Sequence, residues 1–212
     1  PRILKALRRI LRQREVPIED REVLGWDATD NGTVAVQTSS GVVRTRHCCI
    51  TTGAWAPLLL RPLGMDLPVE PRRGQIVLWK LPDPAVHRVI NEGPRYMLAR
   101  PDGHLLVGST VEDVGYDGAV TSAGISELTQ FARGLLPMLS DVEPIRSWAG
   151  LRPASLDGQP YLGIVPGHDG VSVATGHFRS GIHLAPATAR LMRQLILGES
   201  PDLDMTWFAL AR

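Results

Sequence analysis

The fold class is decided by the stretch His47-Cys48-Cys49-Ile50-Thr51-Thr52-Gly53-Ala54-Trp55. A short apolar run enters a glycine turn there, and the residues that follow, Ala56–Leu60, predict a turn of helix. A continuous apolar strand that ends in a glycine turn and leads into a helix is typical of the buried parallel sheet of an α/β domain. Because ligands bind where such strands end, the stretch also predicts the neighbourhood of a site.

The residues before this stretch predict a helix and then a β-meander. Apolar residues recur at spacings of three and four over residues 3–11, and the arginines between them are expected to form a solvated face. From about residue 22 the period changes to two. Strands are predicted over residues 22–28 and 33–38, with turns at 30–32 and 39–41.

The residues after Pro62 predict a second, mainly antiparallel layer. Strands are predicted over residues 74–81, 95–100 and 104–109, and Ser122 is expected to cap a helix that runs to about residue 136. Two short strands, over 161–165 and 171–175, and a long helix, over 181–198, follow. The fold class is therefore α/β (α+β), with domain limits at residues 1–62, 63–147 and 148–212 and the first and last parts forming one domain.

Composition excludes several classes of protein. Of the 212 residues 43% are hydrophobic, enough for one large core or two modest ones. Lysine plus arginine (23) nearly equals aspartate plus glutamate (22), so the charge pattern predicts no nucleic-acid partner. No apolar run approaches the roughly 20 residues of a membrane helix. The two cysteines are adjacent and poorly placed for a disulfide, which favours a reducing, cytoplasmic location.

Two arginines in glycine-punctuated blocks predict a small anionic ligand. Arg152 lies within residues 148–154, WAGLRPA, and Arg179 within residues 176–182, GHFRSGI. A guanidinium grips a carboxylate through two parallel hydrogen bonds and stays charged when partly desolvated. Arg179 also falls at the start of the last predicted helix, where unpaired N–H groups favour negative charge. A reduced flavin is one candidate for that position.

Several blocks together resemble the flavin-dependent D-amino-acid oxidase superfamily, and most of all its glycine oxidase branch, which is linked to thiamine (thiazole) biosynthesis. The resemblance covers nearly the whole chain, and it lies in the order and spacing of the blocks Thr51–Trp55, Pro71–Gln75, Trp148–Ala154, Asp157–Gly163, Gly176–Ile182 and Leu184–Thr188.

The resemblance implies noncovalent FAD in a Rossmann-like domain, with a substrate domain built on a mainly antiparallel sheet. It implies that Arg152 clamps the substrate carboxylate and that Tyr96 and Arg179 reach the same region. Val23 would meet adenine, and Thr52 and Gly53 would lie near the adenosine and pyrophosphate part. The remaining cofactor contacts that we expect are Trp55, Leu151, Gly176, His177, Phe178, Ser180, Gly181 and Ile182.

The implied reaction is oxidation of a small amino acid or N-alkyl glycine, such as glycine, sarcosine or a D-amino acid. Hydride passes to flavin, the imine hydrolyses to an oxo acid, and oxygen yields hydrogen peroxide. Two alternatives are a D-amino-acid dehydrogenase with a different electron acceptor and a truncated, non-catalytic module. The expected partners are the substrate and oxygen, and the oligomeric state, including a homo-oligomer, is left open. No metal is expected, because His177 and His183 have no further clustered ligands.

Three features depart from the resemblance. Ser180 stands where relatives often have asparagine, and His183 where an aliphatic residue is common. The Gly-x-Gly-x-x-Gly turn that would cradle the pyrophosphate is missing from the sequence, and the first residue is Pro1, so we expect an N-terminal βαβ portion to be absent.

From the residues alone, other roles for the three proposed catalytic residues also stay open. Arg152 could be a salt-bridged strand residue, Arg179 could hold a loop, and Tyr96 could belong to a cross-strand pair.

Overall fold

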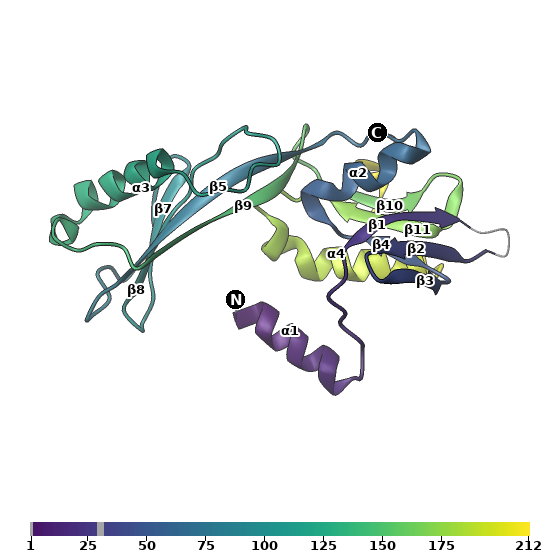
Figure 1. The fold of residues 1–212 in the computed structure, drawn as a ribbon, viewed down its shortest axis with the longest axis horizontal. Helices are drawn as coiled ribbons and strands as arrows, with labels where there is room; N and C mark the ends of the chain where they lie inside the picture. The colour runs from purple at the N-terminus through teal and green to yellow at the C-terminus, as the bar shows by residue number, and fades with distance from the viewer. Residues whose placement is uncertain (1, 29–31) are drawn as a thin grey trace. The chain divides into compact units, whose positions relative to one another are not determined.

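A computed structural model describes residues 2–28 and 32–212 of the chain (Figure 1). Its contacts divide the chain into two compact units, Pro1–Cys48 and Cys49–Arg212. The predicted turn at residues 30–32 lies largely outside the described residues, which resume at Gly32. The domain limits drawn from the sequence at residues 62 and 147 stay a prediction.

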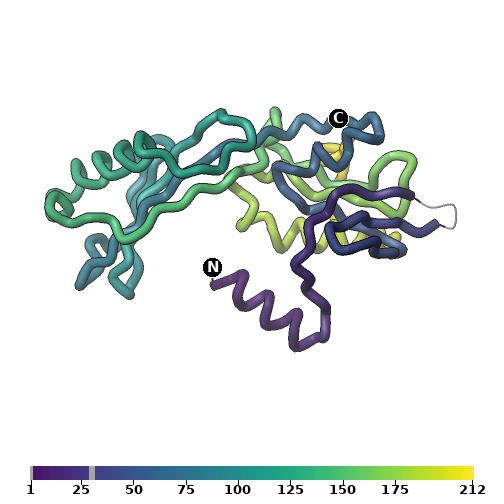
Figure 2. Tube along the Cα trace, viewed as in Figure 1, coloured from purple at the N-terminus to yellow at the C-terminus, as the bar shows by residue number. Residues whose placement is uncertain are grey.

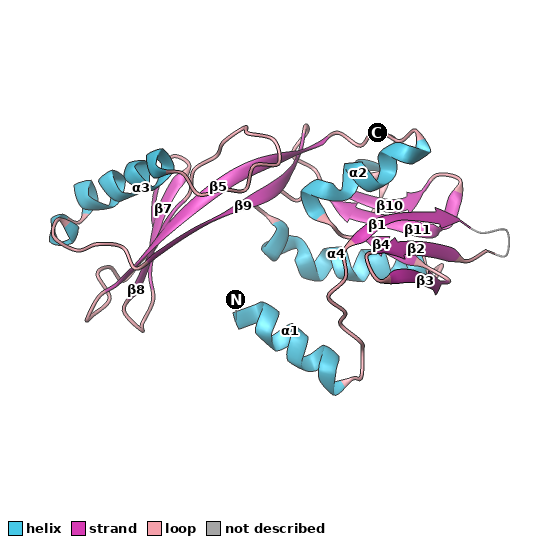
Figure 3. Ribbon diagram, viewed as in Figure 1, coloured by secondary structure: helices cyan, strands magenta, loops and turns pink. Residues whose placement is uncertain are grey.

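The first unit contains one helix and the expected meander (Figure 3). Helix α1 (Arg2–Gln13) has an apolar stripe, as its spacing predicts, and buries none of its residues. Strands β1 (Val23–Ala28), β2 (Val34–Thr38) and β3 (Gly41–Thr45) pair antiparallel in that order. The predicted helix and meander are confirmed.

A small sheet in the second unit carries the stretch that decided the fold class. Its strand order is β10 (Tyr161–Val165), β11 (His168–Thr175) and β4 (Cys48–Ile50). After β4 the chain forms a 3-10 turn, η1 (Gly53–Trp55), and then the helices α2 (Ala56–Leu60) and η2 (Arg61–Leu63). Helix α4 (Gly181–Ile196) packs on the sheet through the cluster Leu162, Leu191 and Met192. The expected strand, glycine turn and helix are all present, although the strand is only three residues long.

A five-stranded antiparallel sheet forms the rest of the second unit, and its path can be followed in Figure 2. The strand order is β6 (Ile90–Glu92), β7 (Arg95–Ala99), β8 (His104–Gly108), β5 (Val69–Lys80) and β9 (Arg146–Ser155). The β5–β9 ladder contains ten successive residue pairs, including Arg72 opposite Arg152 and Gly74 opposite Gly150. This ladder fixes which residues of the two strands share a face.

Helix α3 (Ser122–Leu135) covers one face of this sheet, as Figure 1 shows. The core between them includes Val77 and Trp79 of β5 and Leu128 of α3. Because side chains alternate along a strand, the even-numbered residues of β5 that flank Gly74 point to the opposite face. That face carries the candidate site.

Three details differ from the sequence-based expectation. Thr121, not Ser122, caps α3, because its hydroxyl accepts a hydrogen bond from the Gly124 N–H at 3.2 Å. Strand β5 begins at Val69 rather than at Gly74, because its first residues pair with β9. Strand β6 was not expected. The chain also contains the short 3-10 turns η3 (Pro137–Leu139) and η4 (Thr206–Phe208).

Candidate functional site

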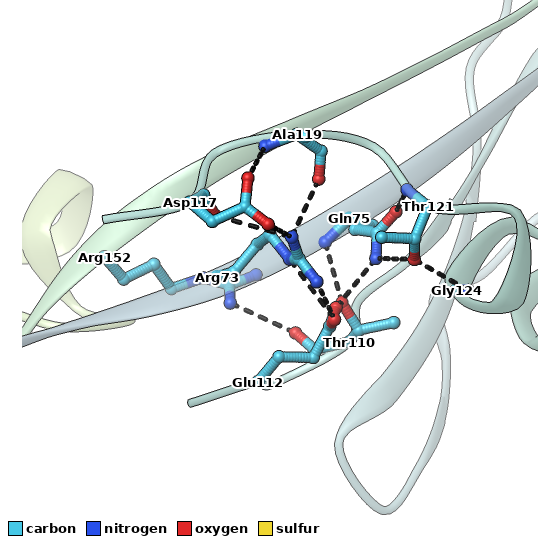
Figure 4. A network of polar contacts seen from close by, with 9 residues as sticks. All are labelled: Arg73, Gln75, Thr110, Glu112, Asp117, Ala119, Thr121, Gly124 and Arg152. Carbon is cyan, nitrogen blue, oxygen red and sulfur yellow. Dashed lines mark hydrogen bonds and ion pairs between the residues drawn. The ribbon is translucent and has the colours of Figure 1, made fainter. Parts of the chain in front are cut away.

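Arg152 of β9 is half-buried, and its guanidinium bonds to uncharged oxygens. Nη1 donates to the Thr110 carbonyl at 3.2 Å (Figure 4), and Nη2 donates to the Ser109 hydroxyl at 2.7 Å. Within residues 2–28 and 32–212, no carboxylate forms an ion pair with it. Burial lowers the pKa of Arg152, and so does the positive charge of Arg179 nearby, whereas Tyr96 raises it. A desolvated cation is thus left without an anion.

The structure brings the other two proposed catalytic residues to the same region. Tyr96 of β7 lies opposite Gly108 of β8, and Gly108 lies opposite Ile76 of β5, so Tyr96 shares the face of Arg152. Arg179 is exposed, and its Nη2 donates to the carbonyl of Pro94, two residues before Tyr96, at 3.3 Å. Arg179 and Tyr96 are both near enough to Arg152 to act electrostatically on its guanidinium.

A neighbouring arginine shows what a salt-bridged strand residue looks like in this sheet. Arg72 lies directly opposite Arg152 and forms ion pairs with Glu70 at 2.6 Å and Asp113 at 2.5 Å. Arg72 is therefore a salt-bridged strand residue, whereas no carboxylate among the described residues forms an ion pair with Arg152. The two arginines lie opposite each other on adjacent strands, but Arg72 is paired with carboxylates and Arg152 with uncharged oxygens.

On the opposite face, Arg73 is at the centre of a polar network. It is only 4% exposed, and it forms ion pairs with Glu112 at 2.6 Å and Asp117 at 2.8 Å. Gln75 donates to Glu112 at 2.8 Å and to the Thr121 hydroxyl at 2.9 Å (Figure 4). Burial alone would raise the pKa of Glu112, but hydrogen bonds from Arg73, Thr110 and Gln75 hold it below its ordinary value.

Thr110 connects this network to Arg152. Its hydroxyl donates to Glu112 and accepts a hydrogen bond from the Gln75 N–H, while its carbonyl accepts the bond from Arg152. Sequence reasoning assigned no role to Ser109, Thr110 or Glu112. The polar pair Ser109-Thr110, at the end of the strand predicted over 104–109, is the signal that could have indicated them.

The glycine turns expected near the cofactor lie where two strands end. The hydroxyl of Thr175, the last residue of β11, donates to the Gly53 carbonyl at 2.8 Å, so the carboxyl ends of β4 and β11 lie together. Gly53 has φ +58° and Gly176 has φ +80°, which side-chain-bearing residues rarely adopt. A Cβ at Gly176 would come within 3.3 Å of Ser155 and Tyr161. Thr52 directly precedes Gly53.

The segment from His177 to Ile182 leads from β11 into the first residues of α4. The N–H of Phe178 donates to the Pro153 carbonyl at 2.7 Å, and His177 Nε2 lies 2.9 Å from the Thr188 hydroxyl. Burial lowers the pKa of His177. The first N–H groups of a helix have no intrahelical acceptors, and in α4 these groups start at Gly181. The Ser180 side chain does not cap them. Ile182 is 74% exposed.

The remaining proposed cofactor residues, Trp55, Leu151 and Val23, lie on three different elements. The Trp55 ring lies 6.0 Å from the Tyr116 ring, and the Tyr116 hydroxyl donates to the Ala54 carbonyl at 3.0 Å. Leu151 pairs with Arg73, so its side chain points to the face opposite Arg152. Val23 belongs to β1 of the first unit.

The described residues contain neither a cluster of metal-binding side chains nor a helix that could span a membrane. In residues 2–28 and 32–212, no three His, Cys, Asp or Glu side chains gather as a metal site would require. Over the same ranges, every helix is too short or too polar to span a bilayer.

Comparison with known proteins identifies the family. Residues 1–195 match the DAO family, described as FAD dependent oxidoreductase, and the chain belongs to this family. A glycine oxidase of Pseudomonas aeruginosa is 42% identical over 213 residues, which covers 100% of this chain and 58% of that protein. The resemblance in the sequence blocks is thereby confirmed.

Solved structures agree with the sequence comparison. The glycine oxidase of Geobacillus kaustophilus superposes with a TM-score of 0.85 at 32% identity, covering 92% of this chain and 53% of that one. The iminodiacetate oxidase of Chelativorans sp. BNC1 gives a TM-score of 0.86 at 30% identity, covering 95% and 55%. The chain thus spans little more than half the length of these relatives.

FAD is the cofactor of this family, and the residues present fit part of it. The first turn of α4, which has no side-chain cap, offers N–H groups to an electron-rich edge. At Gly53, the nearest neighbour of a built Cβ is Pro153 Cγ at 3.8 Å, an ordinary contact distance, so this strand end is less crowded than the turn at Gly176.

Proposed function

We propose that this chain forms the carboxylate-binding part, and part of the FAD site, of an oxidase of small amino acids or N-alkyl glycines. One observation carries the proposal: Arg152 is half-buried, bonds to two uncharged oxygens and has Arg179 beside it. A cation that has lost water without gaining an anion from the protein is unfavourable. A substrate carboxylate restores the balance.

The side chains divide the work of binding and orientation. A guanidinium has five N–H groups, and Arg152 uses two of them within the protein. The remaining N–H groups suit a carboxylate, while the Tyr96 hydroxyl and Arg179 flank the same position. Fixing the carboxylate aims the α-carbon hydrogen, and such orientation contributes much of the rate in reactions of this kind.

FAD, when bound, supplies the acceptor for the hydride of the α-carbon. The overall change is an amine oxidised to an imine, which hydrolyses to the oxo acid, with oxygen reduced to hydrogen peroxide. No side-chain base is needed, because the neutral amine already carries the electron pair that becomes the C=N bond. Glycine is the first substrate to test, since the related proteins are glycine oxidases, and a role in thiamine biosynthesis is part of the same proposal.

The proposed cofactor contacts follow the sequence blocks. Residues 176–182 would line the flavin ring, Thr52 and Gly53 would lie near the adenosine and pyrophosphate, and Trp55 would lie beside them. Val23 would meet adenine. Leu151 would act through its main chain, because its side chain faces away from Arg152. The absence of a cysteine near Arg152 supports noncovalent attachment.

The decisive experiment compares two facing arginines in the full-length enzyme loaded with FAD. Arg152→Met should raise the KM for glycine by about 10- to 100-fold, which corresponds to losing one charged hydrogen-bonded contact. FAD content should stay unchanged. The control is Arg72→Met, which removes the arginine that lies opposite Arg152 on the neighbouring strand. Because Glu70 and Asp113 already neutralise Arg72, this substitution should alter the KM by less than about twofold. An Arg152→Met enzyme with the normal KM would refute the carboxylate role.

A second measurement separates the oxidase from its alternatives. With glycine, sarcosine and D-alanine under air, the oxidase releases hydrogen peroxide in step with substrate loss. Turnover that requires an artificial electron acceptor and yields no peroxide would indicate a dehydrogenase. A full-length protein that takes up no FAD and stays colourless would indicate a non-catalytic module.

A further inference from the structure

Gly74 of β5 leaves the space in which the Arg152 guanidinium lies. A Cβ built on Gly74 would fall 2.0 Å from Nη1, 2.1 Å from Nη2 and 2.2 Å from Cζ of Arg152. All three nearest atoms belong to the guanidinium and none to the backbone. Because Gly74 does not have a positive φ, its backbone conformation does not require glycine. Glycine is therefore required at this position because it has no side chain, and not because of its backbone conformation.

We propose that Gly74 is a positioning residue for substrate binding: it lets the Arg152 guanidinium lie flat against β5, in the one orientation that aims its free N–H groups at a carboxylate. This inference rests on the proposed function. Ser109 and Thr110 hold the guanidinium from one side through hydrogen bonds of 2.7 and 3.2 Å, and Gly74 provides the surface beneath it.

The size of the expected displacement follows from the contact distances. Ordinary van der Waals contact for a Cβ begins at 3.4 Å, so a methyl group at Gly74 would push Nη1 away by about 1.4 Å and Nη2, which donates to Ser109, by about 1.3 Å. A shift of that size breaks the 2.7 Å bond to Ser109, because hydrogen bonds weaken steeply beyond about 3.2 Å. The long side chain would then sample several orientations, and two-point binding of a carboxylate depends on one.

The same distances indicate that the substitution should spare the fold. The atoms in conflict are the far end of a flexible side chain, so the guanidinium can shift while the backbone stays in place. Gly74→Ala is therefore expected to change ligand binding and to leave the thermal midpoint of unfolding within about 2 °C of the wild-type value. An exposed glycine of α3, Gly134, has no atom within 4 Å of a built Cβ, and Gly134→Ala is the matched control.

The test is a double-mutant cycle on the full-length, FAD-loaded enzyme, with acetate as the probe and flavin absorbance as the signal. Acetate has a carboxylate and no amine, so its Kd reports on the clamp alone. Gly74→Ala should raise the acetate Kd and the glycine KM by about tenfold, with a smaller change in kcat. In an Arg152→Met background, Gly74→Ala should cause no further loss, because its partner is gone. Gly134→Ala should change neither constant.

The outcomes separate the positioning role of Gly74 from the carboxylate-binding role of Arg152. An equal loss from Gly74→Ala with and without Arg152 would overturn the positioning role, because the effect would not pass through the guanidinium. A normal Kd in Gly74→Ala, together with a raised Kd in Arg152→Met, would also overturn it and leave the proposed function intact. A normal Kd in Arg152→Met would instead refute the proposed function.

The same variants still test the proposal if Gly74→Ala prevents folding. If Gly74→Ala alone does not fold, the double variant with Arg152→Met should fold, because the conflict is removed. Failure of both would overturn the proposal.

Discussion

Arg73 and Arg152 lie in the two longest strands of one sheet, on opposite faces, and their surroundings are opposite in kind. Arg73 is buried and forms ion pairs with Glu112 and Asp117, whereas Arg152 is half-buried and bonds to a hydroxyl and a carbonyl. The first side chain has its counter-charges within the protein. In the part of the chain that the structure describes, the second has none, and this difference is what the proposed role of Arg152 in binding an anionic ligand rests on.

His177 adds a useful contrast to Arg152. Burial lowers its pKa, so the imidazole can lose its proton and remain neutral when desolvated. An arginine remains charged under any ordinary condition. A desolvated arginine without a carboxylate is therefore a stronger sign of an anionic ligand than a desolvated histidine.

The largest expected effect is on stability and comes from Arg73. Arg73→Met would leave the Glu112 carboxylate without its main partner and should lower the thermal midpoint by about 5–10 °C. The adjacent Arg72→Met removes more exposed ion pairs and should lower it by less than about 2 °C. Thermal unfolding followed by circular dichroism measures both. Equal losses in the two variants would remove the distinction between a buried network and a surface pair.

A smaller effect should appear as acid sensitivity at Glu112. Its folded-state pKa lies below the ordinary value of 4.5, so its contribution to stability is complete above that value and is lost as the pH falls through the folded-state pKa. Denaturant unfolding between pH 7 and pH 3 should show this loss. Glu112→Gln should flatten the curve below pH 4.5, and an unchanged slope would mean that other carboxylates dominate.

The smallest effect expected has the opposite sign. In the absence of substrate, Arg152→Met should leave the thermal midpoint unchanged or raise it by about 1–3 °C, because it removes a desolvated charge that no carboxylate within residues 2–28 and 32–212 neutralises. Acetate should raise the midpoint of the wild-type protein and not that of the variant. A clear drop in the midpoint of Arg152→Met would place this arginine with Arg73, as part of the structural framework.

Local sequence signals predicted a large part of the fold. The hairpin around Pro101-Asp102-Gly103, the meander and helices α3 and α4 depend on turn chemistry and periodicity within a few residues. The start of β5 and the whole length of β9 depend on pairing between residues about 80 positions apart. Such a ladder leaves little local trace, particularly where Pro71 and Gly74 interrupt the apolar alternation.

The site was predictable in its residue types and not in its contacts. Arg152 stood out through its glycine and proline neighbours, yet nothing local distinguished it from Arg72 as a candidate for a salt bridge. The distinction depends on where the carboxylates of the segment after β8 lie: Asp113 pairs with Arg72, and Glu112 with Arg73. The cap of α3 was missed for a similar reason, since Thr121 and Ser122 are adjacent and only backbone geometry decides between them.

The uninterrupted register of the β5–β9 ladder has an evolutionary consequence. Arg72 and Arg73 are consecutive, so each face of the sheet receives one of them. A one-residue deletion early in β5 would turn Arg73 toward the face that carries Arg152 and would turn Arg72 toward the core, so that neither arginine could reach its carboxylate partners. Natural variants of this chain should therefore accumulate length changes in the turns and keep the spacing of β5 and β9 fixed, even where individual side chains of these strands drift.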